Sequence, residues 1–185
     1  GDFKTVRILR SRQKPRHNAD TILAEIRDGE TSRVEFKASF LYDHKKARAV
    51  KDLQLKELRS EEVIFSSLKT IAALLNCGGG LLFIGIDNDI SIVGIHYDCL
   101  LLGCDKFDGD RWEIEFRNHM TGKFKDGTTL NDYVSVSFVN FKGIYVARIE
   151  ISGRRRLAFL KSGGALKLYR RQGNRTVEVQ IDEIE

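Results

Sequence analysis

The chain has 185 residues with a single proline, and 42% of its residues are hydrophobic and 31% charged. This size and composition indicate one folded domain and exclude a disordered chain, which would be poorer in apolar residues. The longest apolar runs, such as Leu81 to Ile86, fall far short of the roughly 18 residues that a membrane-spanning helix needs. We therefore expect no membrane partner.

In chain order, the spacing of apolar and turn-forming residues predicts a helix over 20–26, a strand over 33–37, a charged loop with helical turns over 43–58, a helix over 60–76, strands over 81–86 and 91–95, a helix over 110–122, and strands over 134–139, 144–151, 156–161 and 166–170. Most strands follow one another as hairpins, with helices inserted between them. This order predicts an α+β fold, with a mixed or antiparallel sheet and packed helices.

The formal net charge of +5 belongs to one end of the chain. Residues 1–19 contain six basic side chains and one acidic side chain, so residues 20–185 are neutral as a whole. We expect residues 1–19 to be a flexible basic tail and residues 20–185 to be a single domain cut from a longer protein. Within the neutral part, residues 152–176 hold eight basic and no acidic side chains, whereas residues 77–118 hold eight acidic and three basic ones.

The odd number of cysteines, three, and the lack of an apolar stretch near residue 1 favour a cytoplasmic chain with reduced thiols. His96, Cys99 and Cys104 form a loose run that resembles the spacing of zinc ligands, and Cys77 is the remaining cysteine. The run lacks a Cys-x2-Cys pair and a clear fourth ligand. The pattern therefore favours ordinary buried thiols over a structural zinc ion.

Three consecutive glycines, Gly78 to Gly80, lie between the helix over 60–76 and the strand that follows it. A phosphate-binding loop needs the opposite order, in which a strand leads through glycines to a helix N-terminus. The order found here favours a helix stop that allows close backbone packing.

The segment Glu35-x-Lys37 places a carboxylate and an ammonium group on the same side of a predicted strand, whose apolar side chains Val34 and Phe36 face the other way. Metal-dependent nucleases use this spacing to hold Mg²⁺ or Mn²⁺ and to neutralise the scissile phosphate, so Lys37 would act beside the metal. The carboxylates that could ligate the metal are Glu30, Glu35, Asp87 and Asp89. From spacing alone, a surface ion pair next to an acidic turn is the favoured interpretation.

The basic stretch near the C-terminus suits a polyanion, because arginine binds phosphate in bidentate geometry and nothing acidic offsets its charge. The alternative is a solvated edge balanced by the acidic middle of the chain. We expect nucleic-acid contacts from Arg154, Arg155, Arg156, Lys161, Tyr169, Arg171, Asn174 and Arg175. In this set Tyr169 would stack on a base.

Several segments, in order and at fitting distances, resemble the Schlafen AlbA-like domain family over residues 20–176. They are Gly29-Glu30-x4-Glu35-Phe36-Lys37, Leu68 to Asn76, Gly78 to Asp87, Ile92 to Ile95, Phe159 to Lys161, and Tyr169-x-Arg171-x-Gly173-Asn174-x-Thr176. The resemblance implies an α+β domain of a type described as DNA-binding and found as a module of larger bacterial proteins.

In animal members of the family, a related core cleaves RNA with two glutamates and an aspartate around a divalent metal. The resemblance places Glu30 and Glu35 at the two glutamates. At the position of the aspartate this chain has Asn88, flanked by Asp87 and Asp89, whose side chains would alternate away from it. This departure counts against an efficient nuclease.

Three hypotheses follow. The first is a nucleic-acid-binding module that needs no cofactor, with DNA or RNA as partner. The second is a ribonuclease dependent on Mg²⁺ or Mn²⁺, in which Glu30, Glu35, Lys37 and Asp87 would be catalytic. The third is a regulatory protein-interaction module, such as part of a transcriptional regulator. The sequence does not determine the oligomeric state, and a homo-oligomer is one of the alternatives that it leaves open.

Overall fold

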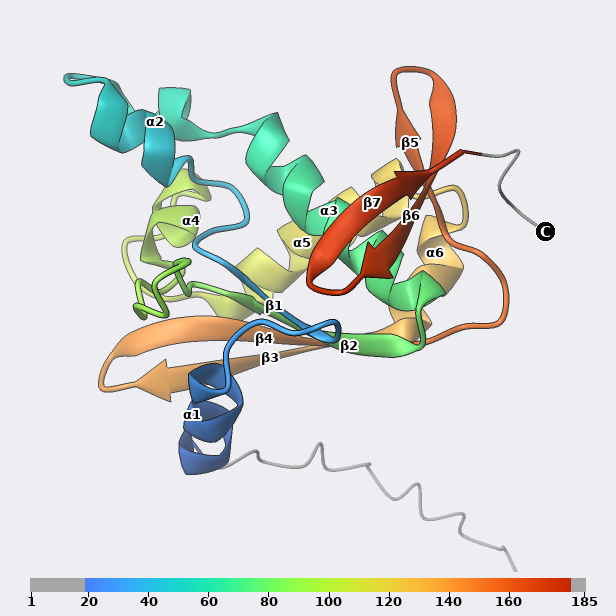
Figure 1. Ribbon diagram of the computed structural model, residues 1–185. Coiled ribbons are helices and arrows are strands. Elements are labelled where there is room, and N and C mark those ends of the chain that lie inside the picture. Colours follow the sequence, from blue (N-terminus) through green and yellow to red (C-terminus); the bar gives the residue numbers. More distant parts are fainter. Residues whose placement is uncertain (1–18, 181–185) are drawn as a thin grey trace, which may run out of the picture.

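A computed structural model describes residues 19–180, which form two β-sheets with helices packed against them (Figure 1). Residues 1–18 and 181–185 lie outside the described residues, and with them nearly all of the segment expected to be a flexible tail. The elements are α1 (Ala19–Arg27), β1 (Val34–Lys37), α2 (His44–Ala49), the 3-10 turn η1 (Leu55–Leu58), α3 (Glu61–Asn76), β2 (Gly79–Ile84), α4 (His96–Leu101), α5 (Gly109–Lys123), α6 (Gly127–Leu130), the 3-10 turn η2 (Asn131–Tyr133), β3 (Val134–Phe141), β4 (Ile144–Ser152), β5 (Phe159–Ser162), β6 (Ala165–Gln172) and β7 (Arg175–Val179).

The larger sheet is mixed, with four strands in the order β1-β2-β4-β3. β1 runs parallel to β2, and the remaining neighbours are antiparallel. Parallel strands need a crossover connection, and here it contains α2, η1 and α3. β1 is an edge strand, so the backbone N–H and C=O groups on its outer edge can form hydrogen bonds with segments outside the sheet.

Helices cover both faces of this sheet. On one face, Ile22 and Ile26 of α1 share a buried cluster with Phe36 and Phe83 of the sheet. On the opposite face, α3 and α5 enclose the main core, which Figure 1 shows as a helical layer on the side of the sheet away from α1. Ser60 caps α3 by accepting a hydrogen bond from the backbone N–H of Val63.

The smaller sheet is antiparallel, has the order β5-β6-β7, and packs against α3. Asn76, the last residue of α3, joins this helix to the smaller sheet through its side chain. Its side-chain amide donates to the carbonyl oxygens of Ala158 and Tyr169, each at 3.0 Å, and accepts from the N–H of Ala158 at 2.8 Å. The smaller sheet is therefore fixed at the C-terminal end of α3, close to the start of β1 (Figure 1).

The glycines after α3 make the close packing that their position predicted. Gly79 has φ +91°, and a Cβ atom there would collide with the carbonyl oxygen of Ile151. A Cβ atom on Gly80 would collide with the carbonyl oxygen of Arg33. Glycine thus lets β2 enter between two backbone segments.

The predicted α+β class, with a mixed sheet and packed helices, is confirmed. The strand predicted over 91–95 is wrong, because only an isolated bridge joins Ile86 and Ile92 there and Gly94 turns the chain at φ +73°. The outward placement of Glu35 is also wrong: its residue is only 8% exposed, since Arg171 of β6 reaches that side of β1. Within the described residues, no helix is long and apolar enough to cross a membrane.

Candidate functional site

Glu35 is at the centre of a polar cluster where β1 meets the smaller sheet. Its Oε1 lies 2.6 Å from the ammonium Nζ of Lys37, and its Oε2 lies 2.9 Å from Nη1 of Arg171. The side chain of Arg171 is 3% exposed and donates further hydrogen bonds to Thr176 Oγ1 and to the carbonyl oxygens of Thr31 and Ser32. The predicted contact between Glu35 and Lys37 is present. The sequence analysis did not predict that Arg171 would also pair with Glu35.

The other predicted metal ligands are engaged elsewhere. Glu30 accepts a hydrogen bond from the N–H of Phe36 at 2.9 Å. Asp87 forms an ion pair with Arg48 at 2.9 Å, and this hydrogen bond is the main cause that holds the pKa of Asp87 below its usual value. Asp89 accepts from the hydroxyl and the N–H of Ser91, and these bonds lower its pKa.

This arrangement does not fit a bound divalent ion. Both oxygens of Glu35 face cations, and Asp87 is paired with Arg48. Among residues 19–180, no three His, Cys, Asp or Glu side chains are grouped so as to hold a metal ion. The carboxylates instead bind cationic and N–H groups of the chain itself.

An open cavity of about 630 Å³ lies beside this cluster, where β1 and β2 end. Lys37, Asp87 and Asn88 line it, together with two residues that the sequence analysis did not single out, His44 and Arg48. Burial is the main cause that lowers the pKa of His44, which favours its neutral imidazole. Its Nε2 is buried and has no hydrogen-bond partner among the described residues. The lining also holds three carboxylates, Asp43, Glu62 and Asp87, against three cations, Lys37, Lys45 and Arg48, so the cavity can accept a polar ligand without a preference for an anion.

Asp98 of α4 holds the wall of this cavity in place. The aspartate is fully buried and accepts hydrogen bonds from the Ser39 hydroxyl and the indole N–H of Trp112. It also accepts from the backbone N–H groups of residues 40–42, at 2.9 to 3.0 Å. The segment after β1, which contributes Ser39 and Tyr42 to the cavity, is thereby fixed to α4 and α5.

The structure divides the predicted nucleic-acid contacts into buried and exposed side chains. Arg171 is enclosed with Glu35. The side chain of Arg154 is 7% exposed, with its guanidinium 3.8 Å from Asp126 and over the ring of Tyr133. Tyr169 is 4% exposed and packs against Phe65 of α3, and burial is the main cause that raises its pKa to about 12. None of these three presents its polar group to solvent.

Arg155, Arg156, Lys161, Asn174 and Arg175 are exposed. Of their cationic groups, only that of Arg156 lies within 4 Å of a described carboxylate, and its Nε is 3.9 Å from Asp126. Arg170, which was counted in the basic stretch but not singled out as a contact, is exposed as well and has no ion pair to a described carboxylate. The alternation of β6, with Arg170 and Arg171 on opposite sides, is the pattern that distinguishes these two arginines.

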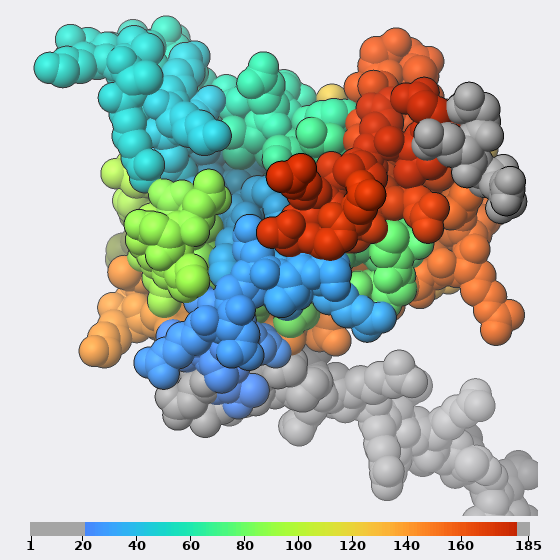
Figure 2. Space-filling model, viewed as in Figure 1, coloured from blue at the N-terminus to red at the C-terminus, as the bar shows by residue number. Residues whose placement is uncertain are grey.

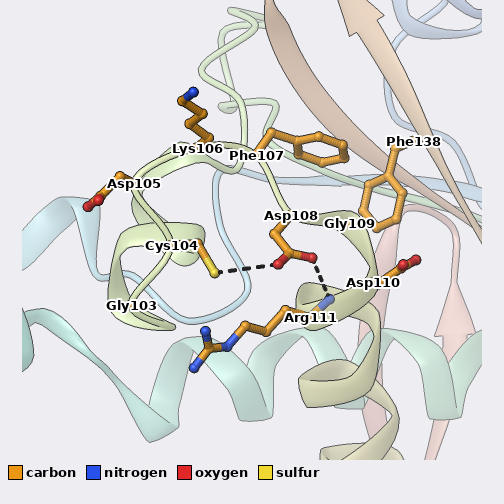
Figure 3. A pocket seen from close by; sticks show the side chains of 10 residues that line it. All are labelled: Gly103, Cys104, Asp105, Lys106, Phe107, Asp108, Gly109, Asp110, Arg111 and Phe138. Atoms are coloured by element: carbon orange, nitrogen blue, oxygen red, sulfur yellow. Dashed lines mark hydrogen bonds between the residues drawn. The ribbon is translucent and has the colours of Figure 1, made fainter.

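A second open cavity, of about 690 Å³, lies in the loop between α4 and α5 (Figure 3). Asp108 turns inward, where it caps α5 through the N–H of Arg111 and lies 3.9 Å from the thiol of Cys104. Cys104 and Cys99 are buried, and burial raises the pKa of the Cys99 thiol. Cys77 lies apart from them, because its sulfur accepts a hydrogen bond from the N–H of Arg171. Among the described residues, no three of the four residues considered for zinc are grouped so as to hold a metal ion.

These features define an α+β domain with a polar cluster at an edge strand and a cationic smaller sheet. Residues 30–180 match the protein family described as "Schlafen, AlbA_2", and the chain belongs to this family. Membership is consistent with a nucleic-acid-binding module. No curated protein matches the chain.

The DIP2311 protein from Corynebacterium diphtheriae, known from a crystal structure, is similar in fold. The match has a TM-score of 0.52 with 15% sequence identity and covers 80% of this chain. The chain corresponds to only 22% of that protein's length.

Proposed function

We propose that the chain is a nucleic-acid-binding module that contacts phosphates through exposed basic side chains of its C-terminal part. The observation that carries the proposal is the set of exposed cations on and before the smaller sheet that no described carboxylate neutralises: Arg155, Lys161, Arg170 and Arg175. Cations that no carboxylate neutralises keep their charge available for phosphates and release counterions when they bind, and Lys161 donates a hydrogen bond to the neutral carbonyl oxygen of Gly122. Arg156, at the edge of ion-pair distance from Asp126, adds to this field.

Reversing two exposed charges in the loop before β5, with Arg155→Glu and Arg156→Glu together, is expected to weaken binding at low salt by roughly tenfold or more. The slope of log affinity against log salt should fall by about two units, one for each phosphate that the variant no longer neutralises. Electrophoretic retardation and fluorescence anisotropy over a salt series measure both quantities.

The matched control reverses two lysines near η1, Lys51→Glu and Lys56→Glu, which changes the net charge equally at exposed positions outside the smaller sheet. Equal weakening in the two double variants would show that net charge alone, rather than this surface, governs binding. If no nucleic acid is retarded by the unaltered chain at low salt, the proposal is wrong and the regulatory protein-interaction module takes its place.

A metal-dependent ribonuclease is the second candidate. The contact between Glu35 and Lys37 beside the cavity favours it, but it requires Glu35 and Asp87 to exchange their cationic partners for the metal ion. Incubating labelled RNA with Mn²⁺ tests it, with Lys37→Met as the variant, because Lys37 is partly exposed and its loss leaves Glu35 paired with Arg171. The nuclease hypothesis expects cleavage that Lys37→Met abolishes. Absence of cleavage, or equal cleavage by both preparations, contradicts it.

A further inference from the structure

The smaller sheet has two chemically different faces. Along β6, Lys167, Tyr169 and Arg171 project toward α3 and β1, as the contact of Tyr169 with Phe65 and the ion pair of Arg171 with Glu35 establish. Side chains alternate along a strand, so Leu168 and Arg170 project to the opposite side. We call this opposite side the outer face.

The strand register extends the outer face across all three strands. Residues directly opposite each other in an antiparallel pair project to the same side. Leu166 is opposite Lys161, Leu168 is opposite Phe159, and on the other edge Arg170 is opposite Val177 and Gln172 is opposite Arg175.

Lys125 joins the same face from outside the sheet, because its ammonium nitrogen lies 5.8 Å from the ring centroid of Phe159. Four cations thus share the outer face: Lys125, Lys161, Arg170 and Arg175. The only carboxylate in the sequences of β5, β6 and β7 is Glu178, which is opposite Tyr169 and pairs with Lys167 on the inner side. No strand residue of the outer face is therefore acidic.

Apolar side chains lie between these cations. Leu168, between Phe159 and Val179, is only 2% exposed, whereas Phe159, Val177 and Val179 are half-buried and Leu166 is 38% exposed, so the accessible apolar surface surrounds Leu168. The C-terminal strands form part of the molecular surface, as the red segment of Figure 2 shows. An outer face with cations and a partly exposed aromatic ring offers two kinds of contact at once, to phosphate and to an apolar, planar group.

A nucleic-acid strand supplies both partners only when it is unpaired. In a duplex the faces of the bases are stacked inside and the phosphates form the outside, so Phe159 and the valines would gain nothing from it. In a single strand the base faces are free to stack on aromatic and aliphatic side chains while the phosphates pair with the cations. Arg170 and Arg175 lie on neighbouring strands, and Lys161 lies about 14 Å from Arg170 along the strand direction, so the cations can follow several successive phosphates.

We propose that the outer face of the β5-β6-β7 sheet binds single-stranded nucleic acid, with bases against Phe159 and the neighbouring aliphatic side chains and phosphates at Lys125, Lys161, Arg170 and Arg175. This inference rests on the proposed nucleic-acid binding, and it specifies that the nucleic acid is single-stranded and that it binds on the outer face. The outer face has no carboxylate to accept a hydrogen bond from a ribose hydroxyl, so single strands of DNA and RNA should bind alike.

The experiment measures fluorescence anisotropy at low salt with oligothymidylate and oligouridylate of about 12 nucleotides and with a duplex of equal length. We expect both single strands to bind at least roughly tenfold more tightly than the duplex. Arg170→Glu with Arg175→Glu should weaken single-strand binding by roughly tenfold or more, while Lys51→Glu with Lys56→Glu should not.

Phe159→Leu separates stacking from charge. It keeps an apolar side chain of similar size, and thermal unfolding verifies that the variant is folded. We expect it to weaken single-strand binding about fivefold or more and to leave duplex binding unchanged. Photocrosslinking with a 5-iodouracil oligonucleotide, mapped by mass spectrometry, should label the outer face and gives a readout that needs no variant.

The possible failures are distinguishable. Duplex binding as tight as single-strand binding, equal losses for both ligands in Phe159→Leu, or crosslinks confined to other surfaces would overturn the single-strand inference, while the proposed function would stand. No binding to any of the three ligands would overturn both.

Discussion

Asp98→Ala is expected to lower the free energy of unfolding by about 3 to 5 kcal/mol, because it leaves several buried donors without an acceptor. The carboxylate accepts from the Ser39 hydroxyl, the Trp112 indole and the N–H groups of residues 40–42, in a place that water does not reach. An alanine methyl group replaces none of these bonds. Urea unfolding, followed by fluorescence of the single tryptophan and by circular dichroism, measures the loss.

Two further substitutions give this measurement its controls. Asp98→Asn keeps an acceptor oxygen, so it should destabilise the protein less than Asp98→Ala, whereas Asp105→Ala removes an exposed carboxylate and should cost little. A loss in Asp98→Ala no larger than that in Asp105→Ala would contradict the role assigned to Asp98. Because Asp98 also fixes the wall of the 630 Å³ cavity, ligand binding there should weaken together with stability.

The elements that the sequence predicted are those whose local pattern and tertiary environment agree. Apolar residues at helical spacing predicted α3 because they do enter the core, where the C-terminal half of the helix is buried on every side. By contrast, α4 has six residues and begins after Ile95 without a side-chain cap, so it carried no helix signal. β7 was not predicted because only its first two residues, Arg175 and Thr176, were considered, as the end of the basic stretch, although Thr176-Val177-Glu178-Val179 alternates as a strand does.

The candidate site shows what residue type alone leaves out. Charge put Arg170 and Arg171 in one basic stretch, and the side-chain alternation of β6 would have placed them on opposite sides. Which of the two faces inward depends on α3 and β1, and Arg171 reaches a glutamate 136 residues earlier in the chain. No local pattern encodes such a contact. The guanidinium of Arg171, for which a nucleic-acid contact was predicted, is therefore already paired with Glu35 inside the fold. The side chain of Tyr169, for which base stacking was predicted, is likewise buried.

The ion pair between Glu35 and Arg171 gives a second large effect, and the two partners should not be equivalent. Glu35→Ala leaves Arg171, with its side chain 3% exposed, next to Lys37 without a counter-charge, and is expected to cost about 3 to 5 kcal/mol of unfolding free energy. Arg171→Met should cost less, because Glu35 keeps Lys37 at 2.6 Å and water can reach the carbonyl groups of the exposed residues Thr31 and Ser32.

The double variant, Glu35→Ala with Arg171→Met, should be more stable than Glu35→Ala alone, because it also removes the buried guanidinium that Glu35→Ala leaves without a counter-charge. Urea unfolding of the four proteins in this cycle measures the coupling between the two side chains. Folded Arg171→Met should also bind nucleic acid nearly as the unaltered chain does, since the guanidinium lies on the inner side of β6, whereas Arg170→Glu should weaken binding. Additive losses of stability across the cycle would show that the two side chains are not coupled. A large loss of nucleic-acid affinity in folded Arg171→Met would show that Arg171 contacts the nucleic acid after all.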